Sequence, residues 1–335
     1  SAFMKVIKIL AFLLSFASLQ AQQVWSLEDC INHALVNNIS LKQSKLTIEL
    51  NENSYTQSKF QRYPSVNANT SANRNTGRSV NPNTNQFIEE VITSVNFSYS
   101  SNITLFNGFK NTNQIKKAAN ELLKSKYDLE SSKNELISSI ALSYLQILFN
   151  KELFYTSTKQ LDLIKAQETR INTLVVAGSL AKGELLNIQS QKALEEQRLI
   201  QAENQLNLSK LQLAQLLEIE NYQDLTLKAE QIKVPKFILK NNINEDYKAA
   251  LSVQSTIKAS ELAISSTLYD YKIARANYLP SLSLSHSMSS LYIDNISDLI
   301  SPNSQLQNNL QGGISFRLTI PIFNNWNTRT SVNQS

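Results

Sequence analysis

The chain contains the stretch Arg62-Tyr63-Pro64-Ser65-Val66, which recurs about 216 residues later as Tyr278-Leu279-Pro280-Ser281-Leu282. In both places a polar-rich helical pattern ends at the proline, and an alternation of apolar and polar residues follows. The alternation runs to Phe106-Asn107-Gly108 in the first copy and to Phe323-Asn324-Asn325 in the second. The chain therefore carries a duplicated unit, a helix followed by a pair of strands, and this duplication decides the fold. The same offset pairs Lys42 with Lys258, Ser44 with Ser260, Leu46 with Leu262, Ile48 with Ile264, Tyr55 with Tyr271 and Pro64 with Pro280.

The N-terminal residues predict a signal peptide over 4–21. Lys5 and Lys8 form a short basic start, an apolar run follows, and small or polar residues end the segment. Cleavage is expected after Ala21 or, alternatively, after Ala17. Removal of two lysines lowers the formal net charge from +5 to about +3, which is too small to indicate nucleic-acid binding.

Cysteine usage and hydropathy restrict the class of protein further. The lone Cys30 cannot form an internal disulfide, and it does not directly follow the signal peptide, where a lipid anchor would attach. No later apolar run approaches the ~18 to 20 residues that a membrane helix requires. Any membrane contact of the mature chain is therefore expected to come from strands or from surface binding.

The middle of the chain predicts a long antiparallel helical hairpin. Between Phe109 and Ala177 there is no glycine or proline, and leucine or isoleucine recurs every seven residues. At ~1.5 Å per residue this helix would be roughly 100 Å long. A break at Ala177-Gly178-Ser179 precedes a second helix, which ends at about Leu217. The thin apolar stripe of both helices indicates contact along a seam, with water on the other faces.

Shorter helices are predicted on either side of the strand pairs. The first runs from about Leu27 to Val36, with Ser26 as its N-cap, and a break at Asn37-Asn38 precedes a longer helix that ends before Pro64. A single helix is expected over about Glu245 to Asn277, and a short strand near Leu225 to Leu227. Long polar loops are expected over Gly77 to Gln86 and Ile293 to Asn309.

The strands carry the membrane interpretation. Strands of about ten residues with one apolar and one polar face are typical of a tilted outer-membrane barrel strand. The alternative, a soluble β-sandwich, is disfavoured because helical insertions of ~100 residues separate the strand pairs. Arg317 is expected to point into the lumen, either as a charge that tunes which solutes pass or as a plain solvated lumen residue. The residues expected to face lipid are Val95, Phe97, Tyr99, Ile103 and Leu105 of the second strand and Ile314, Phe316, Leu318, Ile320 and Ile322 of the last strand.

The sequence contains little that could support catalysis, a cofactor or a metal. It has only His33 and His286, a single cysteine, no glycine-rich phosphate loop after a strand and no nucleophile elbow. Cys30 and His33 lie three residues apart on a predicted helix, but two ligands are weak evidence for a metal, and ordinary packing is the alternative. We therefore expect no enzymatic activity, no cofactor and no metal site.

Taken together, these features resemble the TolC-type outer membrane efflux proteins. The matching residues are Trp25-Ser26-Leu27-Glu28-Asp29-Cys30-Ile31, Ala34-Leu35-Val36-Asn37-Asn38, both proline-ended helices, the two Phe-Asn strand exits and Ala177-Gly178-Ser179. The resemblance implies an α+β membrane fold that assembles as a homotrimer. Each subunit would give four strands to one shared twelve-stranded barrel, and long periplasmic helical hairpins would extend from that barrel. Four strands alone cannot close a barrel, so trimerisation is required if each subunit contributes only these.

The resemblance also implies a function and partners. The chain would be a passive exit duct of a tripartite efflux or type I secretion system, in the outer membrane of a Gram-negative bacterium. It would be coupled to an inner-membrane transporter through a periplasmic adaptor protein, and it would not bind nucleic acid. A non-conducting periplasmic helical scaffold is the alternative, and the exported substrate stays open. The turn implied to contact the adaptor comprises Val175, Val176, Ala177, Gly178, Ser179, Leu180, Ala181 and Lys182, although Gly178 has the alternative role of a simple helix C-cap.

The duplication also predicts where the chain departs from that family. Only about twelve residues follow Phe323, so a second helical hairpin is missing; we expect the chain to be a fragment, without the gate residues that this hairpin carries. The expected divisions are the periplasmic helices over 22–63, the first β-hairpin over 64–107, the long helical hairpin over 108–217, a connector over 218–244, a periplasmic helix over 245–279, the second β-hairpin over 280–323 and the start of a truncated helix over 324–335.

Overall fold

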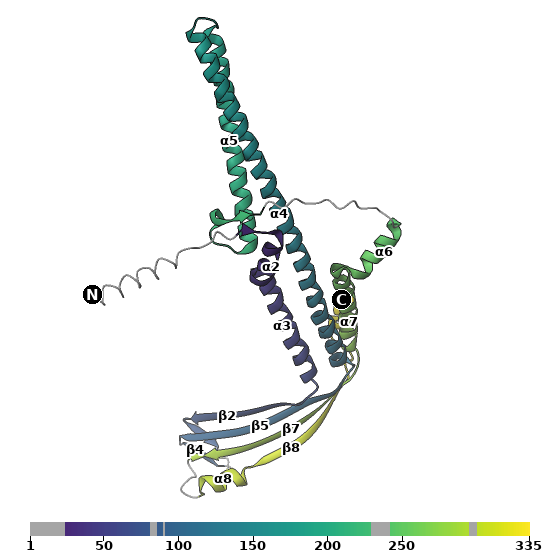
Figure 1. Cartoon of the computed structure of the whole chain (residues 1–335). Coiled ribbons are helices and arrows are strands. Elements are labelled where there is room, and N and C mark those ends of the chain that lie inside the picture. Colours follow the sequence, from purple (N-terminus) through teal and green to yellow (C-terminus); the bar gives the residue numbers. More distant parts are fainter. Residues whose placement is uncertain (1–23, 81–85, 90, 229–241, 295–299) are drawn as a thin grey trace, which may run out of the picture. The chain divides into compact units, whose positions relative to one another are not determined.

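The structure is a computed structural model that describes residues 24–80, 86–89, 91–228, 242–294 and 300–335 (Figure 1). The predicted signal peptide lies outside the described residues. The chain divides into two compact units, one made of Ser1–Leu46 with Asp128–Gln254 and the other of Thr47–Tyr127 with Ser255–Ser335. Each unit combines segments from distant parts of the sequence.

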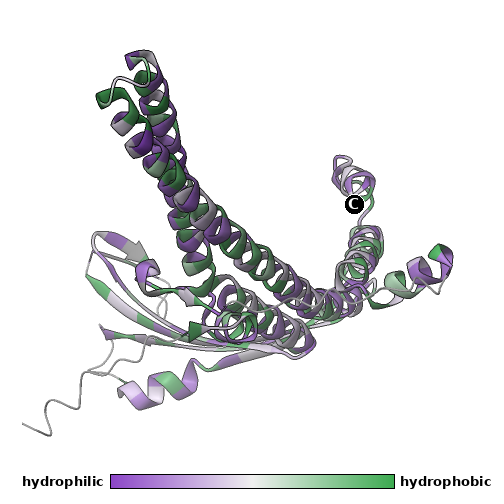
Figure 2. Cartoon of the chain, turned by 45° about the horizontal axis from the view of Figure 1, so that its top comes forward, coloured by the Kyte–Doolittle hydropathy of each residue, from purple (hydrophilic) through white to green (hydrophobic). Residues whose placement is uncertain are grey.

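The first unit contains the helical hairpin. Helix α4 spans Lys110–Val176, with residues from 128 onward in this unit, and α5 spans Lys182–Leu217. The two helices lie side by side up to the turn that joins them (Figure 1). Polar and apolar residues are interleaved along both (Figure 2), so the buried seam is narrow, as the heptad spacing predicts. The Asn150 amide donates to the Gln205 carbonyl across this seam at 3.3 Å.

Helix α2, over Leu27–Asn37, packs on α5 in the same unit. Ser26 and Asp29 form a capping box: the Ser26 hydroxyl accepts from the Asp29 amide at 3.2 Å, and the Asp29 carboxylate accepts from the Ser26 amide at 3.1 Å. This satisfies two of the amides that a helix start leaves without partners. Cys30 and Ala34 are fully buried. The predicted N-cap at Ser26 is therefore confirmed.

The first unit also contains a small parallel sheet of two strands. Strand β1, over Val24–Trp25, pairs with β6, over Thr226–Leu227, which follows the 3-10 helix η2 at Tyr222–Asp224. The buried hydroxyl of Tyr144, on α4, donates to the Lys228 carbonyl at 2.6 Å and lies 3.4 Å from the Trp25 carbonyl. One side chain of the long helix thus holds the ends of both short strands, and the strand predicted near Leu225 to Leu227 is confirmed.

The break after α2 is made by Asn38. Its side-chain oxygen accepts from the amides of Ser40 and Leu41, at 3.0 and 3.3 Å, and its amide group donates to the Leu216 carbonyl at 3.1 Å. Asn38 therefore caps the start of α3, which spans Ile39–Phe60. The break predicted at Asn37-Asn38 is confirmed.

The second copy repeats this break, although its sequence predicted one continuous helix. Instead of one helix there are two, α6 over Ile243–Val253 and α7 over Ser255–Ala276, separated by Gln254. Gln254 has extended backbone angles, φ −66° and ψ 117°, which a continuous helix cannot contain. The repeat offset places Gln254 at the position of Asn38, so the duplication extends to the hinge between the two helices.

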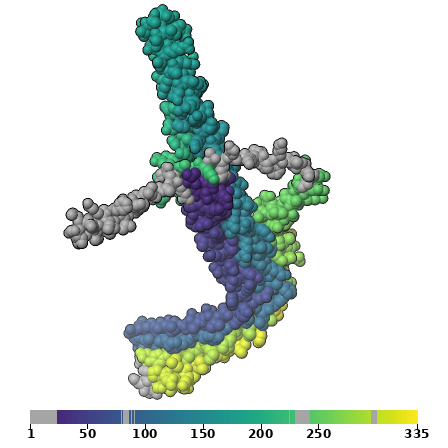
Figure 3. Space-filling model, viewed as in Figure 1, coloured from purple at the N-terminus to yellow at the C-terminus, as the bar shows by residue number. Residues whose placement is uncertain are grey.

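The second unit is built around a four-stranded antiparallel sheet of order β2-β5-β7-β8. The strands are β2 at Ser65–Asn75, β5 at Ile92–Asn107, β7 at Ser281–Ile293 and β8 at Gln311–Thr319. The two hairpins pair through β5 and β7, so the sheet is continuous across the duplication (Figure 3). Strands β2 and β8 are the two edges, and among the residues that the structure describes their outer backbone groups have no ladder partner.

The loops between paired strands contain short elements that were not predicted. Strands β3, at Arg78–Val80, and β4, at Phe87–Glu89, form a small hairpin. Helix α8, at Pro302–Asn308, is held to β7 by side chains: Gln305 accepts from the Ile293 amide at 3.0 Å, and Asn309 donates to the Leu291 carbonyl at 2.6 Å. These hydrogen bonds supply partners for backbone groups of β7 after Ser289, where β8 no longer lies opposite.

The last strand is shorter than its alternation predicts. Strand β8 ends at Thr319, so Ile320 and Ile322 lie after the strand, and their assignment to a strand was wrong. Pro321 explains the difference, because proline has no amide for the ladder and restricts the residue before it. The short helix α9, at Asn327–Gln334, follows.

Candidate functional site

The strand register separates the sheet into two faces. Residues directly opposite each other in an antiparallel ladder point to the same side. Tyr99 is opposite Met288, Ile103 is opposite Leu284, and Leu284 is in turn opposite Phe316. We call this side the apolar face. It comprises Val66, Ala68, Thr70, Ala72 and Arg74 of β2, Thr93, Val95, Phe97, Tyr99, Ser101, Ile103 and Phe106 of β5, Leu282, Leu284, His286, Met288, Ser290 and Tyr292 of β7, and Gly312, Ile314, Phe316 and Leu318 of β8.

Most residues expected to face lipid thus share one side of the sheet, with one exception among the strand residues. The register shifts between Thr104 and Phe106, so that Phe106 lies opposite Leu282 and Leu105 is the extra residue of a β-bulge. Phe316 and Ile314 are each 69% exposed in the single chain. An apolar surface of this kind is unfavourable in water and calls for an apolar covering.

The opposite side, which we call the polar face, consists mainly of small uncharged polar residues, and Ile92, Leu291 and Ile293 form an apolar cluster at one end of it. Arg317 lies on this face, opposite Ser283, and it is the only ionisable residue of this face in β2, β5, β7 and β8. The other members include Ser65, Asn67, Asn69, Ser71 and Asn73 of β2, Ser94, Asn96, Ser98, Ser100, Asn102 and Thr104 of β5, Ser281, Ser283, Ser285, Ser287 and Ser289 of β7, and Gln311, Gly313, Ser315 and Thr319 of β8.

Both hairpins return to a helix through the same backbone turn. After β5, Gly108 and Phe109 both have φ +65°; after β8, Asn325 and Trp326 have φ +52° and +63°. Asparagine adopts this left-handed region more readily than most residues, which explains its presence where the first copy has glycine. In each copy the preceding asparagine donates a side-chain hydrogen bond into the first helical turn, from Asn107 to Asn111 and from Asn324 to Thr328.

Gly108 is required for a second reason. A Cβ at this position would lie 2.8 Å from the Ala276 carbonyl oxygen and 2.9 Å from the Leu279 Cβ, both at the end of the helix that leads to the second hairpin. The first exit turn is therefore in direct contact with the second entry turn. No sequence pattern within one copy could reveal this contact.

Close to these turns, contacts between the start of α4 and α7 join the two copies of the repeat. The Lys117 ammonium lies 2.8 Å from the Asp270 carboxylate, and the Asn120 amide donates to the Ser265 hydroxyl at 2.8 Å. Partial burial acts to lower the pKa of Lys117, but the hydrogen bond to Asp270 and the charges of Glu121 and Asp270 outweigh it and raise the pKa. Lys117 therefore stays charged at physiological pH.

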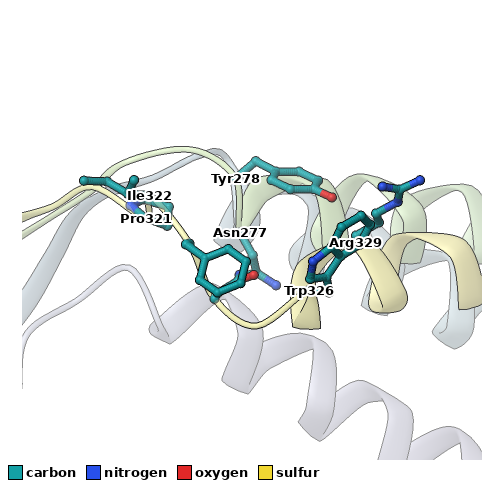
Figure 4. A pocket seen from close by; sticks show the side chains of 8 residues that line it. Asn277, Tyr278, Pro321, Ile322, Trp326 and Arg329 are labelled. Atoms are coloured by element: carbon teal, nitrogen blue, oxygen red, sulfur yellow. The ribbon is translucent and has the colours of Figure 1, made fainter.

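A groove lies beside the second exit turn (Figure 4). It encloses a cavity of about 270 Å³ lined by Asn277, Tyr278, Pro321, Ile322, Phe323, Asn324, Trp326 and Arg329. The Arg329 guanidinium lies 4.2 Å from the Trp326 ring centroid, a cation–π contact. The lining is mainly apolar and lacks a cluster of acidic or nucleophilic groups, so it does not resemble a catalytic site.

The turn at the end of the hairpin is a Schellman motif. The Ser179 amide donates to the Leu174 carbonyl at 2.9 Å and the Gly178 amide donates to the Val175 carbonyl at 3.0 Å, with Gly178 at φ +76°. The C-cap role predicted for Gly178 is confirmed. The turn also presents apolar surface, since Val176 is 81% and Leu180 38% exposed.

An ion pair joins the two helices near this turn. The Lys192 ammonium lies 3.0 Å from the Glu168 carboxylate, and this hydrogen bond raises the pKa of Lys192 above its ordinary value. Lys192, on α5, therefore contacts α4. The pair is partly exposed to solvent and contributes little to stability.

The Cys30 and His33 pair is explained by packing. Burial, followed by the charge of Asp29, raises the pKa of the Cys30 thiol to about 12, so the thiol stays protonated. The His33 ring lies edge-on to the Trp25 ring at 5.1 Å. Within the described residues, no group of three or more histidine, cysteine, aspartate or glutamate side chains could hold a metal ion. In that same part of the chain, no helix has the length and apolar character needed to cross a membrane.

Comparison with known proteins identifies one family. The family described as "Outer membrane efflux protein" matches residues 30–218, which is more than half of the chain. The search of curated proteins found no match.

Several solved structures share the fold. A membrane protein from Pseudomonas aeruginosa is 20% identical with a TM-score of 0.75, over 94% of this chain and 70% of that one. The CmeC outer membrane channel of Campylobacter jejuni is 16% identical with a TM-score of 0.77, over 92% and 64%. The outer membrane protein VceC of Vibrio cholerae is 17% identical with a TM-score of 0.68, over 92% and 71%. The chain therefore spans about two thirds of the length of these proteins.

Proposed function

Because the chain belongs to the outer membrane efflux protein family, we propose that it is one subunit of a passive exit duct formed by three copies. The family membership confirms the predicted outer-membrane localisation, with a large periplasmic helical part, and it identifies a transport protein rather than an enzyme. The trimer, the shared barrel and the coupling to a transporter are the parts that we propose.

The two-faced sheet is the observation that carries this proposal. Its apolar face needs an apolar covering, its polar face needs water, and its edges β2 and β8 need partners. A closed ring of strands in a membrane satisfies all three needs at once, since lipid covers the outside, water fills the inside and every backbone group is paired. Four strands are too few for such a ring, and twelve strands from three copies are sufficient.

The helical turn supports coupling to a partner. Val176 and Leu180 expose apolar surface at the end of a polar hairpin, and contact with a second protein would remove that surface from water. We propose that Val175 through Lys182 contact the periplasmic adaptor of the system, which joins the duct to an inner-membrane transporter. In this arrangement the transporter supplies the energy and the duct supplies only a path.

Replacing Val176 and Leu180 together by aspartate should disrupt the adaptor contact. Burying two carboxylates in an apolar interface without partners is costly, so the adaptor recovered with the protein after cross-linking in cells should fall by about tenfold or more. Leu194→Asp is the matched control, because Leu194 is 54% exposed on α5 away from the turn. Equal adaptor recovery from both variants would contradict the contact.

The duct itself is tested by fractionation and by conductance of the purified full-length protein in planar bilayers. The proposal predicts a heat-modifiable trimer in the outer-membrane fraction and stepwise conductance in the bilayer. A non-conducting periplasmic scaffold, in contrast, would be recovered without detergent and would give no conductance steps. A protein that is recovered without detergent and gives no conductance steps would contradict the proposed duct.

A further inference from the structure

The strand residues of the polar face carry one fixed positive charge and no negative charge. Apart from Arg317, the uncharged apolar cluster of Ile92, Leu291 and Ile293 and the glycine Gly313, the face consists of serine, asparagine, threonine and glutamine, whose dipoles can turn toward either sign of charge. Arg317 alone introduces a fixed charge among the strand residues of this face. A guanidinium stays protonated at any physiological pH, so this charge is permanent.

Nothing within the described part of the chain neutralises this charge. Arg317 has no ion pair there, and the residue opposite it, Ser283, is uncharged. Its nearest neighbours on the same face of β8 are Ser315 and Thr319. All three of these neighbours leave the guanidinium free to act on a solute in the adjacent water.

We propose that Arg317 makes the barrel section of the duct favour anionic solutes over cationic ones. This inference rests on the proposed function, because three copies of the chain are needed to place three guanidinium groups in one ring around the lumen. The neutral wall adds no opposing charge, so the ring sets the sign of the potential at this level of the duct.

Ion selectivity that comes from Arg317 should depend on the salt concentration, because salt screens the charge. The field of a fixed charge extends about 30 Å at 0.01 M salt, about 10 Å at 0.1 M and about 3 Å at 1 M. A wide lumen therefore allows three charges to influence a passing ion at low salt but not at high salt. Selectivity that comes from Arg317 should vanish as the salt concentration rises, whereas selectivity from pore width should not.

The test is the reversal potential of the full-length protein in planar bilayers, with 0.01 M potassium chloride on one side and 0.1 M on the other. The wild type should pass chloride in preference to potassium. Arg317→Gln should lower the chloride-to-potassium permeability ratio by about twofold or more, and Arg317→Glu should lower it further. Arg317→Lys keeps the charge and should behave as wild type, which separates charge from side-chain shape.

Ser315→Gln is the matched control, since it changes an uncharged residue on the same face of the same strand and should leave the ratio unaltered. At a tenfold gradient ending at 1 M, wild type and Arg317→Gln should become indistinguishable. Conducting channels whose ratio is the same with arginine, glutamine and glutamate at position 317 would overturn this inference alone. A wild-type protein that gives no conductance at all would instead overturn the proposed duct and, with it, this inference.

Discussion

Lysine in place of Phe316 should nearly abolish assembly in the outer membrane, whereas lysine in place of Ser315 should be tolerated. The two positions are adjacent near the middle of β8 but lie on opposite faces of the sheet. A lysine on the lipid side of a barrel costs about 2–4 kcal/mol near the bilayer midplane, and three copies multiply this cost. We expect the amount of folded protein in the outer-membrane fraction to fall by about tenfold or more for Phe316→Lys.

The neighbouring substitution is the control for synthesis and general folding. Ser315→Lys adds the same side chain at nearly the same depth, but on the polar face, where water solvates it. Its yield should stay close to that of the wild type. Equal yields of the two variants would show that the assignment of the two faces to lipid and water is wrong.

Replacing Gly108 by alanine should destabilise the second unit strongly. The new Cβ would lie 2.8 Å from the Ala276 oxygen, closer than such atoms approach, and Gly108 has φ +65°. The backbone conformation alone costs about 1–2 kcal/mol for alanine, and relief of the clash requires movement of the backbone between α7 and β7. We expect a total loss of about 2–4 kcal/mol, measured as a lower midpoint of thermal unfolding.

Gly178→Ala separates these two effects. Gly178 has a similar φ of +76°, but a Cβ there would meet nothing within 4 Å. This variant should therefore lose only the conformational part, about 1–2 kcal/mol. If both variants lowered the midpoint equally, the close approach at Gly108 would carry no energetic weight.

Local patterns predicted most of the fold. The absence of glycine and proline between Phe109 and Ala177 indicated a single helix, and α4 spans nearly the same residues. Ser26 predicted a capped helix start, and Gly178 predicted a helix end. These predictions held because capping and termination depend on residues only a few positions apart.

Some errors could have been avoided with the sequence alone. The break at Gln254 follows from the repeat offset, once Asn38 is recognised as a break in the first copy. Ser301 followed by Pro302 is a typical helix start, and α8 begins there. Pro321 marks the end of β8, which the apolar alternation of Ile320 and Ile322 concealed.

Other features could not be predicted, because they depend on residues that are distant in sequence. The bulge at Leu105 depends on which residue of β7 pairs with β5, and both Leu105 and Phe106 fit the apolar pattern. The contact of Tyr144 with the Lys228 carbonyl joins residues 84 positions apart. For Arg317, the alternation along β8 was enough to predict on which side of the sheet it lies. That it is the only charged strand residue on that side follows only from the register of all four strands.

In the proposed barrel, the free edges β2 and β8 are joined between neighbouring copies of the chain. Cysteine pairs test it directly, with one cysteine in place of Asn69 on β2 and a second in place of Gly313, Ser315 or Thr319 on β8. The native Cys30 is fully buried and should not interfere. Each single-cysteine variant serves as a control, because one cysteine per chain cannot link more than two chains.

Oxidation of the double variants in membranes should give covalent dimers and trimers for at least one of the three pairs, and no larger species. A ring of three copies stops at the trimer, because no free edge is left. Double variants that oxidise only within a single chain, or that form ladders extending well beyond three, would contradict the claim that three copies close one barrel.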